Sequence, residues 1–328
     1  MGFSLKVCGS DNHDIWNGFV ERANQMFTIA HNPSLGEILK RTYGYQSENY
    51  LIYDGDSLVG VLPVCRIGGT LVSMPHFSYG GVLSSLDYSS RSIRSDVITD
   101  NFSNYEVRCF DRISKFCNTE KLTSFLELQP SVEDQMGYFK SKLRSQIRKG
   151  SKNNLEIRIG SFELLDDFYD VYSKNMHRLG SPAQGKLFFS NILNYYKYGT
   201  TNILCVYHDS KPIGVSFVLS YMGFSEVCWA ATVREYNYLQ TNTFLYWEMI
   251  KLAIGIGNRV FSFGRSTVGS SSHRFKKQWG TKEQKLYFNY SNYSGIDIKK
   301  MQILQKIWRA SPFPLVDLLG PLISKRIY

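Results

Sequence analysis

The sequence predicts an α/β (α+β) protein, with mixed sheets flanked by helices, that consists of two similar halves in tandem. Of its 328 residues, 43% are apolar and 20% are charged, so the chain can build the core of one large or two medium domains. One order of helical and alternating apolar segments also occurs twice in the sequence. These observations exclude a collagen-like, low-complexity or solenoid protein.

The first copy of this order begins with a helix-like segment that ends at a Tyr-Gly pair, residues 43–44. Residues 50–64, YLIYDGDSLVGVLPV, then read as two strands joined by a polar turn at 54–56. A third apolar strand is predicted at 71–74.

The second copy has its Tyr-Gly pair at 198–199 and its strand pair in ILCVYHDSKPIGVSFV, residues 203–218. A third strand at 226–230 leads to NTFLYWEMIKLAIGIG, residues 242–257, whose broad apolar coverage predicts a helix. The strand RVFSFG, residues 259–264, follows this helix. A helix, a hairpin, a third strand and a second helix therefore occur in this order.

Positive charge is concentrated in three segments of the chain. The formal net charge is +10, and residues 138–158, 259–285 and 299–328 each carry a large excess of Lys and Arg over Asp and Glu. Such local fields indicate an anionic partner. The phosphates of a nucleotide-linked or lipid-linked sugar precursor, of tRNA or of an anionic membrane surface would all satisfy them. Solvated charged faces are the alternative for any one segment.

The first of these segments has the clearest order. Lys140, Arg144, Arg148 and Lys152 recur every four residues, which places them on one face of a helix. An apolar stripe runs along the adjacent face. We therefore predict a helix with a basic ridge, in which Arg144 and Arg148 contact the substrate.

Cysteine usage predicts a protein of a reducing compartment, and hydropathy predicts one without a membrane-spanning segment. None of the six cysteines forms a Cys-x-x-Cys pair, so neither a disulfide framework nor a metal site is expected. The N-terminal residues lack the pattern of a signal peptide, and no apolar run is long enough to span a membrane. We expect a cytoplasmic protein, free or peripheral at the inner face of the membrane.

Residues 234–280 carry a specific motif. A Trp-Glu helix is followed by Phe-x-Phe-Gly-Arg-Ser-Thr and then by Phe-Lys-x-Gln-Trp-Gly. This pattern resembles the second domain of Fem-like (FemAB-related) transferases of the GNAT superfamily. MPHFSYGGVL at 74–83, KLRSQIRKGSKNNLEIRI at 142–159 and MHRLGSPAQGKLFF at 176–189 match in the same order. The resemblance covers almost the whole chain, and it is strongest to the branch found with exopolysaccharide and exosortase loci.

The resemblance implies two GNAT-like domains, residues 1–150 and 151–297, and a C-terminal segment, residues 298–328, that packs back on the first. It implies an N-acyltransferase or aminoacyltransferase that acts on a cell-surface polysaccharide or cell-wall precursor. An amine would attack an activated acyl donor directly, and that donor would be aminoacyl-tRNA or acyl-CoA rather than a resident cofactor.

Lys276 and Arg265 are the first candidates for catalytic residues. Lys276 lies between the aromatic residues Phe275 and Trp279, and the resemblance places the matching Fem lysine at the active site. Its ammonium would hold a phosphate or the developing oxyanion. Arg265 ends a strand and opens a Gly/Ser-rich loop, an arrangement that can direct a guanidinium at an anion. An ordinary surface cation is the alternative for both.

Two further segments supply candidates. His177 could act as a general base, because the unperturbed pKa of histidine is about 6.5. Its neighbour Arg178 is predicted to contact the substrate. His76 and Tyr79 precede twin glycines that would let a ligand approach the backbone, so both are predicted to line a pocket.

Asn242, Tyr246 and Glu248 surround the expected donor cleft. The loop before their helix, residues 234–242, contains no glycine, whereas GNAT proteins usually hold the pyrophosphate of CoA with a glycine-rich turn there. We therefore favour aminoacyl-tRNA or another large acyl donor over acetyl-CoA. The alternatives are an acyl-CoA-dependent GNAT enzyme and a non-catalytic RNA-binding or membrane-surface adaptor on the same fold.

Overall fold

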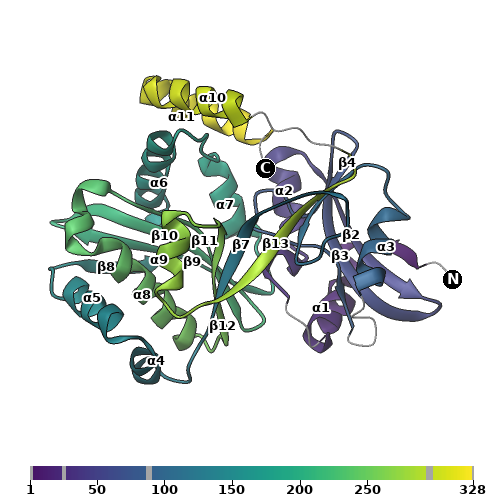
Figure 1. Cartoon of the computed structure of the whole chain (residues 1–328), viewed down its shortest axis with the longest axis horizontal. Helices are drawn as coiled ribbons and strands as arrows, with labels where there is room; N and C mark the ends of the chain where they lie inside the picture. Colours follow the sequence, from purple (N-terminus) through teal and green to yellow (C-terminus); the bar gives the residue numbers. More distant parts are fainter. Residues whose placement is uncertain (1–2, 24–26, 86–90, 293–297, 327–328) are drawn as a thin grey trace.

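The computed structural model describes residues 3–23, 27–85, 91–292 and 298–326. The predicted fold class is confirmed, because the described strands form one mixed sheet with helices packed on it (Figure 1). The first half of the chain forms one unit, whose elements are β1 (Ser4–Val7), α1 (His13–Arg22), α2 (Leu35–Tyr43), β2 (Gln46–Asp54), β3 (Ser57–Ile67), β4 (Thr70–Val72), β5 (Leu83–Ser84), α3 (Arg91–Thr99) and β6 (Tyr105–Cys109).

The second half repeats this arrangement. Its elements are β8 (Glu156–Gly160), α6 (Leu165–Leu179), α7 (Lys186–Tyr195), β9 (Gly199–His208), β10 (Lys211–Tyr221), β11 (Phe224–Thr232), α8 (Thr241–Gly255) and β12 (Val260–Thr267). The strand order β8-β9-β10-β11-β12 matches β1-β2-β3-β4-β6, and the pair β11–β12 is parallel like the pair β4–β6. The twofold repeat predicted from the sequence is thus present.

The two units exchange their last strands. β7 (Phe116–Glu127) follows β6 along the chain but pairs with β12, whereas β13 (Lys282–Tyr290) follows β12 but pairs with β6. β7 and β13 also pair with each other and join the units into one sheet, and they cross the middle of the molecule in Figure 1. The remaining helices are α4 (Val132–Tyr138), α5 (Ser141–Ser151), α9 (Ser271–Lys277), α10 (Ile298–Ala310) and α11 (Phe313–Ser324).

α5 belongs to the second unit. The Cα–Cβ direction of Gly150 points at α8, where an added methyl group would lie 3.2 Å from the Cβ of Phe244. Leu143 and Ile147, the predicted apolar stripe, are buried in the same core as α8. The domain boundary was predicted at residue 150. Two elements before that residue, β7 and α5, nevertheless pack on the second unit.

Turn residues explain where the elements end. α2 ends at Gly44, whose φ of 73° is left-handed and costs glycine little. The first hairpin turn falls at the predicted residues 54–56, with a φ of 57° at Gly55. The second lies inside the predicted strand pair 203–218, with φ values of 50° at Asp209 and 61° at Ser210. Positive φ values of this kind match the twist of two-residue hairpins.

Both faces of the second unit are covered by helices. Along β9, Cys205 belongs to a core shared with α6 and α7, whereas Leu204 and Val206 belong to the core beneath α8. The first of these cores continues into the first unit through Trp16 and Tyr43, so the two units pack against each other. Among the described residues, no helix has the length and apolar composition needed to cross a membrane.

The C-terminal helices α10 and α11 lie on α6, at the top of Figure 1. Gly320 of α11 packs closely on the backbone of Ala183, where an added methyl group would be 3.2 Å from the nitrogen. The end of the segment reaches the first unit, because the hydroxyl of Tyr45 donates a hydrogen bond to the carbonyl of Lys325. The predicted docking of residues 298–328 on the first domain therefore needs correction: most of the described segment packs on the second unit, which offers the exposed side of α6.

Candidate functional site

The parallel strands β11 and β12 separate at one end. They pair over residues 224–226 and 260–262, and no pairing between them continues beyond Glu226 and Ser262. β11 also contains a bulge on its other side, since Phe217 pairs with Trp229 and Val218 with Val227, leaving Cys228 without a direct partner in the register. The strands thus open into a wedge beside a kinked backbone.

The equivalent pair in the first unit, β4 and β6, is continued by hydrogen bonds. In the segment after β4, the Ser73 amide donates to the Glu106 carbonyl at 3.0 Å and the Gly80 amide to the Arg108 carbonyl at 2.8 Å. Phe77, between these two residues, packs on Phe188 and Trp229 of the second unit. In the described part of the first unit, the backbone contact with β6 therefore continues at the place where β11 and β12 separate in the second unit.

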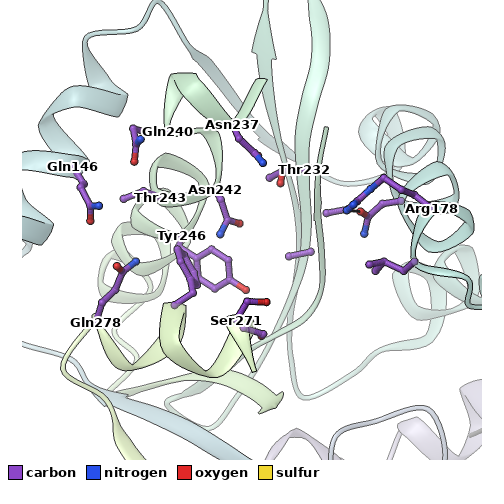
Figure 2. A pocket seen from close by; sticks show the side chains of 16 residues that line it. Gln146, Arg178, Thr232, Asn237, Gln240, Asn242, Thr243, Tyr246, Ser271 and Gln278 are labelled. Atoms are coloured by element: carbon purple, nitrogen blue, oxygen red, sulfur yellow. Dashed lines mark hydrogen bonds between the residues drawn. The ribbon is translucent and has the colours of Figure 1, made fainter. Parts of the chain in front are cut away.

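Two adjoining cavities lie at the wedge. The outer cavity has a volume of about 600 Å³ and lies between the ends of β11 and α6, the middle of α5 and the starts of α8 and α9 (Figure 2). The inner cavity has a volume of about 350 Å³ and lies where the two units meet. Ala230, Tyr246 and Ser272 line both cavities, so the two share a wall at these residues.

The outer cavity is rich in side-chain amides. Arg178 is the charged side chain among the residues that line it. Figure 2 shows Arg178 on one side of the cavity, opposite Asn242 and Tyr246 of α8. Thr241 begins α8 directly after Gln240, which has a left-handed φ of 61°. Six amide side chains line the space: Gln146, Asn175, Asn237, Gln240, Asn242 and Gln278.

Lys276 lies in the wall of the inner cavity and is only 5% exposed. Ser270 caps α9 by accepting a hydrogen bond from the His273 amide, and the last turn of this short helix carries Lys276 toward the wedge. Its Nζ donates to the carbonyls of Gly264 at 3.0 Å and Arg265 at 2.9 Å, on β12. Burial lowers the pKa of Lys276, Glu226 opposes this shift and the Arg265 cation adds to it, so that the pKa is about 8.

A buried polar network lies beneath the inner cavity. The carboxylate of Glu226, 3% exposed, accepts hydrogen bonds from Ser262 at 2.8 Å and from the Tyr79 hydroxyl at 3.2 Å. Thr123 of β7 in turn donates to the Tyr79 hydroxyl at 3.3 Å. Burial raises the pKa of Glu226, and the nearby Lys276 ammonium counteracts this rise. The network links both units and fixes the carboxylate that acts on Lys276.

Arg265 supplies a second cation to the inner cavity. Its side chain is accessible to solvent within the cavity and lies 5.9 Å from the ring centroid of Phe288. No described residue accepts a hydrogen bond from its guanidinium, so all of its donors can serve a ligand. Together with Lys276, it makes this cavity suited to an anion.

The structure places five other predicted residues in or under the cavities. Arg178, Asn242 and Tyr246 line the outer cavity, and Tyr79 lies in the network beneath the inner one. His76 lines the inner cavity, where its Nε2 is 3.1 Å from the Tyr45 hydroxyl. Burial and the Arg108 and Arg265 cations lower the pKa of His76 to about 3, so it is neutral and a weak base near neutral pH.

Four predicted residues are not brought to the cavities. His177 turns toward the C-terminal segment, with its Nε2 3.0 Å from the Ser311 carbonyl. Glu248 is two residues after Tyr246, so its side chain leaves α8 on the side away from the cavities. There it forms an ion pair with Lys251 at 2.7 Å. Arg144 and Arg148 lie on the side of α5 opposite its cavity residue, Gln146, and contact neither cavity.

Glu226 and most of the amide side chains of the outer cavity were not predicted from the sequence. Glu226 stands in the strand FSEVCWAAT, between residues that are buried on both sides. A carboxylate at such a position must be hydrogen-bonded or paired, so its place in an apolar strand was a usable signal. The amides come from α5, α6, α8, the 3-10 helix Arg234–Leu239 and two turns, and no local pattern connects them.

Comparisons with known proteins agree with this geometry. Residues 138–277 match the family described as acetyltransferase (GNAT) domain. The fold is similar to the crystal structure of FemX, with 12% identity, a TM-score of 0.63 and coverage of 92% of this chain and 100% of that one. It is also similar to L-PGS from Bacillus licheniformis, with 11% identity, a TM-score of 0.51 and coverage of 94% and 99%.

A third similar structure is a tandem GNAT protein from the clavulanic acid biosynthesis pathway, with 9% identity, a TM-score of 0.52 and coverage of 89% of this chain and 99% of that one. No curated protein sequence matches the chain significantly. The domain match and the two-unit fold confirm the resemblance to Fem-like proteins of the GNAT superfamily that the sequence predicts.

Proposed function

We propose that the protein is an N-acyltransferase or aminoacyltransferase, because residues 138–277 match the GNAT acetyltransferase domain and the two-unit fold is similar to that of FemX. Its acceptor would be an amine on a cell-surface polysaccharide or cell-wall precursor. The observation that carries this proposal is the buried ammonium of Lys276 at the wedge between β11 and β12, where the two cavities adjoin.

The outer cavity is the proposed donor site. An acyl group bound there can enter the wedge, where β11 and β12 leave backbone groups without a strand partner. Amide side chains suit the bases and sugar hydroxyls at the acylated end of a tRNA, because they donate and accept hydrogen bonds. The pyrophosphate of CoA would find Arg178 as its one cationic partner among the lining residues. This lining supports aminoacyl-tRNA as the donor.

The inner cavity is the proposed acceptor site. Arg265, whose guanidinium is available, would bind a phosphate of a nucleotide-linked or lipid-linked sugar precursor. The acceptor amine, in its neutral form, would attack the acyl carbonyl at the shared wall of the cavities. A C–N bond forms, the ester bond to the donor breaks, and the proton lost by the amine passes to the departing hydroxyl oxygen.

Lys276 would stabilise the oxyanion that develops during this attack. A fixed, buried ammonium is effective because it needs no reorganisation when the charge appears. Its two hydrogen bonds to the β12 carbonyls hold it in place before any ligand binds. We assign no general base: the pKa of His76, lowered to about 3, makes this residue too weak a base for the role.

The pH dependence of transfer follows from this role. Since the ammonium is the working form, activity is expected to fall as the pH rises through about 8, the pKa of Lys276. The Glu226 carboxylate raises that pKa, so Glu226→Gln is expected to move the fall to lower pH. Rate–pH profiles of both proteins test this. Glu283→Gln, at the partly exposed partner of His273, is the control and leaves the profile unchanged. Because the acceptor amine must also lose its proton, both profiles are measured with the same acceptor. A falling limb that stays at the same pH in Glu226→Gln would contradict the assigned role.

The donor is tested by thermal unfolding with added ligands. A ligand of the native state raises the melting temperature, by several degrees at about a hundred times its Kd. We expect aminoacyl-tRNA and a UDP-linked sugar precursor to raise it separately, because they occupy different cavities. A melting temperature that rises with acetyl-CoA but not with aminoacyl-tRNA would instead indicate an acyl-CoA-dependent enzyme.

A further inference from the structure

Helix α11 exposes its large apolar side chains. Four leucines with spacing i, i+3, i+4 and i+7 form one face, with exposed fractions between 36% and 71%: Leu315, Leu318, Leu319 and Leu322. The face that is turned to the protein carries smaller residues: Val316, Gly320 and Ser324. A helix on a water-exposed surface normally has the opposite distribution.

Helix α10 also exposes large apolar side chains. Ile303, Leu304 and Ile307 are exposed by 58%, 52% and 58%, and they lie on adjacent positions of one face. The opposite face of α10 meets the end of α6, because Gln305 and Arg309 are the residues near Gly180. We call the seven exposed side chains of the two helices the apolar tail face.

Cations border the apolar tail face. Lys306, Lys325 and Arg326 are exposed at its edges. Residues 298–328 contain six Lys and Arg residues but a single acid, Asp317. That acid is turned toward the protein, where it accepts a hydrogen bond from the Tyr169 hydroxyl at 3.5 Å. The surface therefore combines exposed leucines with positive charge.

We propose that the apolar tail face binds the surface of an anionic lipid bilayer. The leucines would enter the boundary between head groups and acyl chains, and the lysines and arginine would meet the lipid phosphates. A second copy of the chain would bring two cationic borders together, so charge favours the lipid over self-association. The proposal stands apart from acyl transfer, since none of these side chains lines the inner or outer cavity.

Flotation of the full chain with lipid vesicles tests this proposal. The chain is expected to float with vesicles of phosphatidylcholine and phosphatidylglycerol in equal parts, and more weakly at high salt. Leu318→Ser combined with Leu322→Ser is expected to reduce vesicle binding roughly tenfold or more, because two leucines no longer enter the lipid. Both positions are exposed, so the fold should persist.

The matched control is Ile15→Ser, which changes an exposed apolar side chain on α1, at the other side of the molecule in Figure 1. This variant should bind vesicles like the natural chain. Equal binding by the double leucine variant, or equal binding to pure phosphatidylcholine vesicles, would overturn the proposal. So would light scattering that shows a dimer, if the dimer is lost in the leucine variant and neither form binds vesicles.

Discussion

Replacement of Lys276 by methionine is expected to lower the rate of acyl transfer by roughly a hundredfold to a thousandfold. Methionine keeps most of the length of the buried stem but removes the charge that would face the oxyanion. The loss should appear mainly in kcat, because the developing charge exists in the transition state rather than in the bound donor. Lys276→Gln, which retains an N–H donor for the β12 carbonyls, should show a similar loss.

The adjacent lysine provides a matched control for this experiment. The side chain of Lys277 is 69% exposed and lies 3.6 Å from Glu283, away from both cavities. Lys277→Met should therefore retain nearly full activity, whereas a general need for positive charge on α9 would affect both variants. Melting temperatures of the variants show whether each is folded. Full activity in a folded Lys276→Met protein would show that the Lys276 ammonium does not take part in the reaction.

Local signals made the twofold architecture predictable. Polar turns and alternating apolar strands are short-range features, and they recur in both halves. The predicted helix end at a Tyr-Gly pair is correct for α2, which ends at Tyr43, but wrong for the second half, where α7 ends at Tyr195 and Gly199 begins β9. The exchange of β7 and β13 left no such signal, because both strands have ordinary alternating patterns and their partners are distant in sequence. The domain boundary and the docking of the C-terminal segment depend on this tertiary arrangement, and the sequence could not define them.

The candidate site was predictable where a motif carried it. Lys276 and Arg265 lie in the segment that resembles Fem-like proteins, and the structure places both at one cavity. His177 was a candidate base only because of its residue type, and the position of the C-terminal segment shows that it contacts Ser311 instead. For Arg144 and Arg148, the periodicity correctly defined a common helix face, but periodicity does not tell which way that face points.

Closing the passage between the two cavities is expected to have the second large effect. Ala230 lines both cavities at their shared wall, and a tryptophan there would occupy the space where the acyl carbonyl and the amine must meet. We expect Ala230→Trp to reduce transfer roughly a hundredfold or more, because displacing reactants by an ångström can cost about that factor. Ala230→Ser leaves the passage open and should be nearly normal.

The most direct test of the whole account is single-turnover transfer from preformed donor complex to acceptor, compared between Ala230→Trp and Ala230→Ser. The account predicts that the tryptophan variant still gains thermal stability from the UDP-linked sugar but transfers the acyl group at least roughly a hundred times more slowly than the serine variant. Equal transfer rates in two folded variants would show that the reactants meet elsewhere, and would contradict the assignment of the reaction to the wedge between β11 and β12.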